Sequence, residues 1–124
     1  MYVSLSQDLL FAPGSSTIDQ KGLDALKKLA EVLVKNKDIS ILVEGHTDSD
    51  GEANMNWKLS TDRSLSIVYA LISNQVQPNR ITAAGRGEHV PVASNDTSTG
   101  KAKNRRTDII LSPDLDEIFK LISK

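Results

Sequence analysis

Residues 39–43 constrain the fold more than any other segment of this chain. Their sequence, ISILV, is a short, nearly continuous apolar run rich in β-branched side chains. Such a run is typical of a strand that is buried on both faces. At Glu44 the sequence changes abruptly to the polar residues EGHTD, so the predicted strand ends where an acidic loop opens.

Helical periodicity flanks this strand on both sides. One helix is predicted from an N-cap at Asp19 to about Asn36, and a second at about 56–73. A third is predicted after Pro113, packed on the domain as a C-terminal extension over 113–124. The apolar positions that recur at i, i+3, i+4 and i+7 are Leu26, Leu29, Ala30, Leu33, Leu65, Val68, Tyr69, Ile72, Leu115, Ile118, Phe119 and Ile122.

Three further segments, 3–11, 80–84 and 106–111, have the composition of strands. Residues 85–100 are rich in Gly, Pro, Ser, Asn and Thr and are expected to form a long loop. The resulting order, β-α-β-α-β-β and a C-terminal helix, predicts an α/β fold of the α+β two-layer sandwich type. Helices then cover one face of a mixed sheet. The length of 124 residues fits a single domain, 1–124.

Composition excludes several classes of function. Fifteen basic and sixteen acidic side chains leave a formal net charge of -1, which argues against a nucleic-acid binder. There is no cysteine, so thiol and zinc-thiolate chemistry are excluded. No apolar run approaches the roughly 18 residues of a membrane span. The N-terminal residues MYVS lack an export signal, so a role outside the cytoplasm would require the chain to be part of something longer.

No catalytic, metal or cofactor motif is complete. Neither His46 nor His89 stands beside a serine or cysteine in a known nucleophile setting. The GRGE segment at 85–88 lacks the third glycine of a phosphate loop, because that position is Val90. The acidic loop that begins at Asp48 lacks the glycine and the glutamate of a calcium-binding EF-hand. We therefore expect no enzyme activity, no cofactor and no metal.

Asp48 and Arg63 form the one pair that could bind a ligand. Asp48 follows the buried strand, and Arg63 lies in the early turns of the next helix, on the side of Asn56 and Leu59. A carboxylate and a guanidinium that face one pocket can hold a zwitterionic amino acid by its ammonium and its carboxylate. Spacing alone favours the alternative in which the two side chains simply pair with each other.

An ordered set of motifs extends from this pair over most of the chain. EGHTD at 44–48 is followed by NWKLSTDR at 56–63, then by RI at 80–81 and GRGE at 85–88. Pro91, NDT at 95–97, GK at 100–101 and NRR at 104–106 continue the series. Together they resemble the signature of the OmpA-like peptidoglycan-binding domain over roughly residues 9–111. Ser64 stands where that family usually has alanine.

The resemblance implies non-covalent binding to the diaminopimelate of the peptidoglycan stem peptide. Asp48 would contact its ammonium and Arg63 its carboxylate, while Asn104 and Arg105 would close the pocket from the last strand. Arg106, the next residue, should point to the opposite face of that strand. The residues expected at the ligand are Thr47, Asp48, Ser49, Asn56, Leu59, Arg63, Asn104 and Arg105.

The resemblance also implies a place in the cell. The domain would act in the periplasm of a Gram-negative bacterium and anchor the outer membrane or an envelope protein to the wall. A missing N-terminal region would supply the attachment to the outer membrane. Two alternatives are a fragment of a MotB-type flagellar stator protein and a protein-interaction module that no longer binds the wall.

Overall fold

The computed structural model describes residues 1–113 and 121–123. The helix expected over 113–124 falls largely outside the described residues and stays a prediction. In the described part of the chain, no helix combines the length and the apolar character that crossing a membrane requires.

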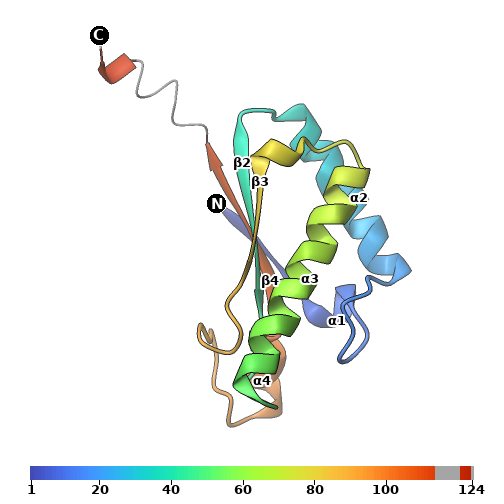
Figure 1. The fold of residues 1–124 in the computed structure, drawn as a ribbon, viewed down its shortest axis with the longest axis vertical. Coiled ribbons are helices and arrows are strands. Elements are labelled where there is room, and N and C mark those ends of the chain that lie inside the picture. The colour runs from blue at the N-terminus through green and yellow to red at the C-terminus, as the bar shows by residue number, and fades with distance from the viewer. Residues whose placement is uncertain (114–120, 124) are drawn as a thin grey trace.

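Four strands of the described chain form one open, mixed sheet (Figure 1). They are β1 (Tyr2–Ser6), β2 (Ile39–His46), β3 (Ile81–Gly85) and β4 (Arg106–Pro113), in the spatial order β1-β4-β2-β3. The strand β4 is antiparallel to both β1 and β2, whereas β2 and β3 are parallel. The last strand of the chain therefore lies between the first two and brings distant segments together.

Two long helices, α2 (Gln20–Lys35) and α3 (Ala53–Ser73), cover one face of this sheet (Figure 1). The α/β two-layer sandwich is thus confirmed. The predicted N-cap is also confirmed, because the Asp19 side chain accepts a hydrogen bond of 3.0 Å from the Gly22 amide. Buried side chains between the layers include Leu26 and Leu33 of α2, Ile67 and Leu71 of α3, and Ile41, Val43 and Ile109 of the sheet.

The strand β2 is more amphipathic than its sequence suggested. Ile41 and Val43 are fully buried against the helices, but Leu42 and Glu44, which point to the other face, are only half-buried. The expectation of burial on both faces is therefore wrong for this strand. The helices α2 and α3 cover a single side, and the opposite side is called the open face below.

Two short helices depart from the predicted order. The strand expected over 3–11 ends at Ser6, whose hydroxyl caps α1 (Gln7–Leu10) by accepting from the Asp8 amide. The loop expected over 85–100 ends in α4 (Ser98–Asn104), which the Thr97 hydroxyl caps at the Gly100 amide. A 3-10 turn, η1 (Pro78–Arg80), precedes β3. Neither α1 nor α4 is long enough to show helical periodicity in the sequence.

Close contact between α3 and the sheet sets the position of the site. A Cβ atom at Gly45 would overlap the backbone carbonyl oxygen of Ser60, so only glycine fits there. The buried Ser64 hydroxyl donates to the Val43 carbonyl oxygen at 3.0 Å and accepts from the Ala84 amide at 3.1 Å. The serine at this position thus bonds α3 to both β2 and β3, and the end of β2 is held beside the first turns of α3.

Candidate functional site

A pocket of about 380 Å³ opens where β2 ends beside the N-terminal half of α3. The chain that follows β2 and the segment around α1 form its other walls. Its lining residues carry both signs of charge, which suits a small zwitterionic group. Its lining residues are Gln7, Asp8, Pro13, Gly14, Thr47, Asp48, Asp50, Asn56, Leu59, Arg63 and Arg105.

Asp48 is a buried carboxylate, 6% exposed, at the floor of this pocket. Its Oδ2 atom lies 2.6 Å from Nη1 of Arg105, and its Oδ1 accepts a hydrogen bond of 2.9 Å from the Asp50 amide. No ion pair joins Asp48 to Arg63 among the described residues. The alternative in which these two side chains simply pair with each other is therefore wrong.

Arg63 is equally buried, 4% exposed, but its partners are neutral. Nε donates to the Ser15 carbonyl oxygen at 2.9 Å, and Nη1 donates to Oε1 of Gln7 at 2.8 Å. The guanidinium also lies over the Phe11 ring, 5.3 Å from its centroid, which is a cation-π distance. Within the described chain Nη2 has no hydrogen-bond partner, so the third nitrogen is available to a ligand.

Electrostatics at Arg63 favour an anion. Burial, followed by the positive charge of Arg105, lowers the pKa of Arg63, whereas Asp48 raises it. A guanidinium stays protonated in proteins nevertheless. The charge is thus poorly compensated by the protein, and a ligand carboxylate would supply the missing partner.

Asn56 and Thr47 shape the loop between β2 and α3. The Asn56 amide nitrogen donates to the Asp50 carbonyl oxygen at 2.9 Å and to Oε1 of Glu88 at 3.3 Å. The Thr47 hydroxyl donates to the Asp48 carbonyl oxygen at 2.8 Å. Gly51 has φ +87°, a left-handed conformation that glycine adopts readily. These bonds fix the loop before any ligand arrives.

The structure brings together six of the eight residues expected at the ligand. Those that line the pocket are Thr47, Asp48, Asn56, Leu59, Arg63 and Arg105. Ser49 is half-buried next to the pocket but does not line it. Asn104 lies outside the pocket, and neither it nor Arg105 belongs to the last strand, because α4 ends at Asn104 and Arg105 is its C-cap.

Asn104 is fully buried and engaged in bonds within the protein. Its side-chain oxygen accepts from the Val92 and Ala93 amides at 2.8 and 3.0 Å. Its side-chain nitrogen donates to the Ala93 carbonyl oxygen at 3.0 Å and to Oδ1 of Asn95 at 2.8 Å. These four bonds hold the loop before α4, so the role that the structure gives Asn104 is support.

Sequence reasoning missed the wall formed by Gln7, Asp8, Pro13 and Gly14. Gln7 matters most, because it is buried and holds Arg63. No local signal marked it, since it begins a four-residue helix inside a segment that resembles a strand. Pro13 and Gly14 are residues typical of turns, but nothing in the sequence places them beside Arg63.

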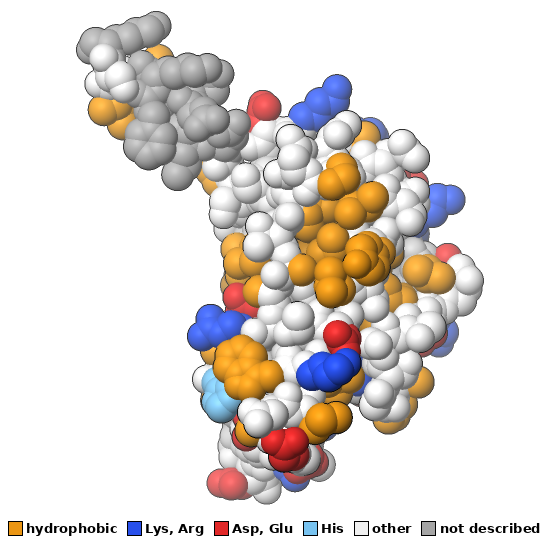
Figure 2. All heavy atoms as spheres, viewed as in Figure 1, with side chains coloured by type: hydrophobic (Ala, Val, Ile, Leu, Met, Phe, Trp, Pro, Cys, Tyr) orange, Lys and Arg blue, Asp and Glu red, His pale blue; other side chains and the backbone are white. Residues whose placement is uncertain are grey.

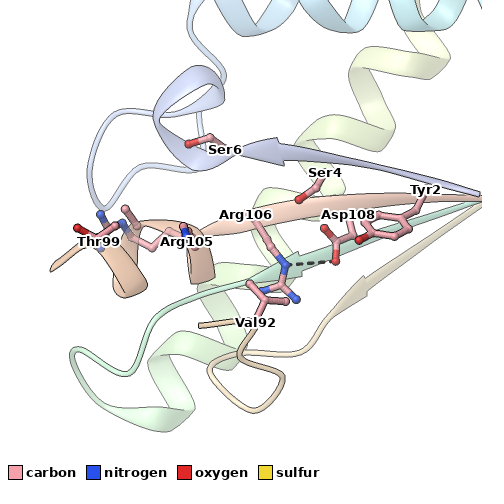
Figure 3. Close-up of a pocket in the computed structure, with 10 residues that line it drawn as sticks. Tyr2, Ser4, Ser6, Val92, Thr99, Arg105, Arg106 and Asp108 are labelled. Carbon is pink, nitrogen blue, oxygen red and sulfur yellow. Dashed lines mark hydrogen bonds and ion pairs between the residues drawn. The ribbon is translucent and has the colours of Figure 1, made fainter. Parts of the chain in front are cut away.

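A second pocket, of about 580 Å³, lies on the open face (Figure 3). Tyr2, Ser4 and Ser6 of β1 form one side, and Arg106 and Asp108 of β4 lie next to them. Arg106 pairs with His46 in the strand register and thus lies on the open face, as its place after Arg105 predicted. Arg105 lines both pockets.

The surface carries no sign of a polyanion site on the face drawn in Figure 2. Lysine and arginine side chains there are interspersed with aspartate and glutamate. Hydrophobic side chains gather over part of the same face. The large hydrophobic residues that α3 exposes are Met55, Trp57 and Tyr69, and Trp57 lies 5.1 Å from the ring of His89.

The family model and the related proteins that match this chain point to the same family. Residues 10–105 match the model described as the OmpA family. The probable lipoprotein YiaD of Escherichia coli (strain K12) is 38% identical over 111 residues, which are 90% of this chain and 51% of that protein. Motility protein B of Bacillus subtilis (strain 168) is 32% identical over 118 residues, 91% of this chain and 45% of that protein. The chain spans about half the length of these curated relatives.

Solved structures have the same fold. The peptidoglycan-associated lipoprotein from Burkholderia pseudomallei superposes with a TM-score of 0.77 at 26% sequence identity. The match covers 88% of this chain and 89% of that chain. The likeness therefore extends over almost the whole of both chains.

Proposed function

We propose that this chain, which belongs to the OmpA family, binds peptidoglycan non-covalently through the diaminopimelate of its stem peptide. One observation carries the proposal. The pocket places the buried Asp48 carboxylate near the buried Arg63 guanidinium, and the two do not neutralise each other. A ligand that has an ammonium and a carboxylate on one carbon matches this arrangement.

Each side chain then has a defined role. Arg63 donates from Nη2 to the ligand carboxylate, because Nε and Nη1 are already bonded to Ser15 and Gln7. Asp48 accepts from the ligand ammonium and shares its charge with Arg105. Leu59 offers an apolar contact to the methylene chain of diaminopimelate, while Thr47 and Asn56 fix the loop. Asn104 supports the pocket from outside it, because its side chain holds the loop before α4.

The names of the relatives support a role at the cell wall. A solved neighbour is a peptidoglycan-associated lipoprotein, and other relatives include proteins named as peptidoglycan-binding. Their names also include a lipoprotein, a motility protein and porins, which differ in how they meet a membrane. We propose a periplasmic anchor that joins an envelope protein, attached to the outer membrane, to the wall.

Binding without catalysis fits the pocket chemistry. Charge-assisted hydrogen bonds contribute about 1.5–3 kcal/mol each. The lost freedom of the ligand offsets much of this gain. Two or three such bonds imply a Kd of roughly micromolar to millimolar. An anchor functions at this strength, because many copies facing one polymer act together.

A stator role is the second candidate. Motility protein B of Bacillus subtilis matches 91% of this chain, so the likeness to that protein is as extensive as the likeness to the lipoprotein. Both candidates use the same pocket and differ in the protein to which the domain is attached. Purification of the native protein from envelope fractions, with identification of its membrane and its partners, would separate them.

The direct test is a calorimetric or NMR titration with meso-diaminopimelate and with a stem-peptide fragment. We expect saturable binding that is lost in Asp48→Asn, which removes the charge and keeps the side-chain shape, and in Arg63→Gln, which removes the charge and shortens the side chain. Asp96→Asn and Arg86→Gln are matched controls, since both residues are exposed and line neither pocket. Absence of binding by the folded wild-type domain would favour an interaction module without wall affinity.

A comparison of amidated and non-amidated stem-peptide fragments tests the role of Arg63 separately. An amidated diaminopimelate lacks the carboxylate charge that Arg63 would bind, so we expect the fragment that carries it to bind more weakly. Equal affinity for the two fragments would contradict the role of Arg63 and leave the role of Asp48 open.

A further inference from the structure

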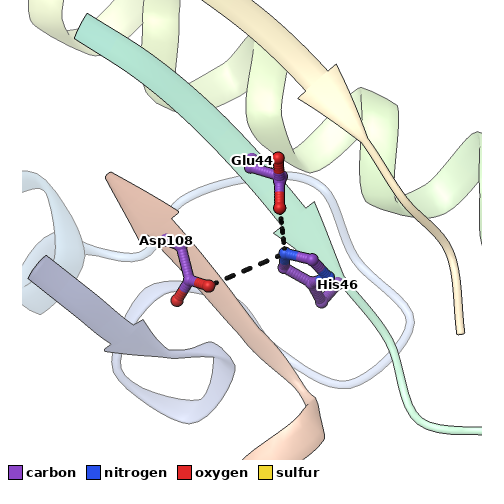
Figure 4. Close-up of side chains that lie close together, drawn as sticks. All are labelled: Glu44, His46 and Asp108. Carbon is purple, nitrogen blue, oxygen red and sulfur yellow. Dashed lines mark ion pairs between the residues drawn. The ribbon is translucent and has the colours of Figure 1, made fainter. Parts of the chain in front are cut away.

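Three potential metal ligands converge on the open face of the sheet. Glu44 and His46 project from β2 on the same side, and Asp108 of β4 is the register partner of Glu44 (Figure 4). One ligand atom from each side chain lies within 4.8 Å of the others. Nε2 of His46 is 2.8 Å from Oε1 of Glu44 and 3.7 Å from Oδ2 of Asp108.

The imidazole of His46 is buried and makes no well-formed hydrogen bond within the described chain. Its side chain is 1% exposed, and neither Nδ1 nor Nε2 has a partner with acceptable hydrogen-bond geometry in the described chain. The Glu44 oxygen is close enough but lies off the direction in which an N–H group would point. Oδ1 of Asp108 is also buried without a partner. Unsatisfied buried polar atoms are rare and require an explanation.

The two distances from Nε2 of His46 bracket the separation between ligands of one metal ion, so the Glu44 oxygen would have to move away from Nε2 for an ion to enter. In a tetrahedral zinc site with bonds of about 2.0–2.2 Å, neighbouring ligand atoms lie roughly 3.3–3.6 Å apart. The two distances from Nε2, 2.8 and 3.7 Å, fall on either side of this range. An ion on the lone-pair axis of the ring would also place the ligand oxygens off that axis, as Glu44 is.

We propose that Glu44, His46 and Asp108 form a binding site for a divalent transition-metal ion such as Zn²⁺. The site has one imidazole nitrogen and two carboxylates, a donor set that such ions accept. The Glu44 and Asp108 side chains are 15% and 14% exposed, which leaves a path for the ion and room for water as a fourth ligand. The ion would cross-link β2 to β4.

A hydrogen bond to Asp108 supports this assignment. One of the two carboxylates is also bonded to an arginine, because Nε of Arg106 donates to Oδ2 of Asp108 at 3.2 Å. Ligating carboxylates commonly receive such a hydrogen bond from outside the coordination sphere.

The site is separate from the diaminopimelate pocket. None of its three residues lines that pocket, and the sheet lies between the open face and α3, which carries Arg63 and Asn56. The inference therefore does not depend on the proposed function. Neither result of a metal titration bears on whether the domain binds the wall.

The test is a titration of the chelator-treated chain with ZnCl₂ by calorimetry, with Co²⁺ absorption as a second readout. We expect one Zn²⁺ per chain, with affinity reduced in Glu44→Gln and Asp108→Asn by at least the order of 10–100-fold that outer-shell changes cause. His89→Ala is the matched control, because His89 is the other histidine of the chain and is exposed. Circular dichroism verifies that each variant folds.

Three results would overturn the proposal. The first is no binding by the wild-type chain, which would leave water or a proton as the partner of His46. The second is one-to-one binding that persists unchanged in both Glu44→Gln and Asp108→Asn. The third is binding that disappears in His89→Ala, which would place the ion at the exposed histidine. A visible Co²⁺ spectrum in wild type and His89→Ala, lost in Glu44→Gln, is the positive outcome.

Discussion

Arg63 and Arg106 are buried arginines on opposite sides of the same sheet, 4% and 7% exposed. All three guanidinium nitrogens of Arg106 have protein partners: Asp108, the Asn104 carbonyl oxygen and the Val90 carbonyl oxygen. Among the described residues, Arg63 has partners for two of its nitrogens, and both acceptors are neutral. The two residues are similarly buried, but only Arg63 has a guanidinium nitrogen, Nη2, without a hydrogen-bond partner in the described chain.

This difference separates a residue that supports the fold from one that is ready for a ligand. A guanidinium whose three nitrogens all bond to the protein adds stability and has less capacity left for a ligand. A guanidinium that is held in place by two bonds, with a third nitrogen facing a pocket, is preorganised. The two arginines therefore predict opposite responses to mutation.

The largest effect is expected from Arg106→Ala. The change leaves the Asp108 carboxylate and two carbonyl oxygens without their partner, and breaking a buried pair typically costs about 3–5 kcal/mol. Urea unfolding would measure the lower free energy of unfolding, while the affinity of the remaining folded protein for diaminopimelate should be unchanged. Arg86→Ala, at an exposed position, should change stability by less than about 0.5 kcal/mol. If Arg106→Ala lost affinity for diaminopimelate but kept its stability, Arg106 would be a ligand-binding residue, which would contradict the comparison.

The second-largest effect is expected from Asn104→Ala, which should lower the free energy of unfolding by less than Arg106→Ala does. The change removes the acceptor of the Val92 and Ala93 amides, and an unsatisfied buried group costs about 1–3 kcal/mol. Thermal unfolding would show the loss, and an NMR titration would show unchanged ligand affinity. If Asn104→Ala instead removed binding from a stable protein, Asn104 would belong at the ligand, as the sequence alone suggested.

Gln7→Glu tests the other arginine without removing it. A glutamate at this position would pair with Arg63 and compensate the charge that the ligand carboxylate requires. We expect the affinity for diaminopimelate to fall about tenfold, equivalent to roughly 1.4 kcal/mol, with stability unchanged or higher. Titration of Gln7→Glu beside Gln7→Met separates the added charge from the lost amide. Tighter binding in Gln7→Glu would show that Arg63 does not meet an anion.

Lys101→Ala should have the smallest effect. The Lys101–Asp50 ion pair, 3.0 Å long, lies at the pocket rim, and the Asp50 side chain is 66% exposed. Such surface pairs contribute about 0–1 kcal/mol, because water screens them. Affinity should change by less than about threefold, and less at high salt. A larger loss would indicate that the rim contacts the ligand directly.

The sequence predicted the elements that have strong local patterns. The long helices α2 and α3 were visible in their apolar periodicity, and the Asp19 cap in its residue type. The sequence did not predict α1 and α4, because these helices are too short for a periodic pattern. Both begin at a capping hydroxyl, that of Ser6 for α1 and that of Thr97 for α4. The alternation along β2 was obscured, because Leu42 is apolar but points to the open face.

By itself, the sequence indicated that Asp48 at the end of β2 and Arg63 near the start of α3 lie at one site, because they belong to two neighbouring motifs, 44–48 and 56–63. Only the tertiary structure decided which groups are partners. Arg105 meets Asp48 from 57 residues away, and Arg63 meets Gln7 from 56 residues away. The Glu44, His46 and Asp108 cluster likewise exists only because β4 pairs with β2 in one register. Local propensity carries no information about such pairings, whereas strand order and register fix them.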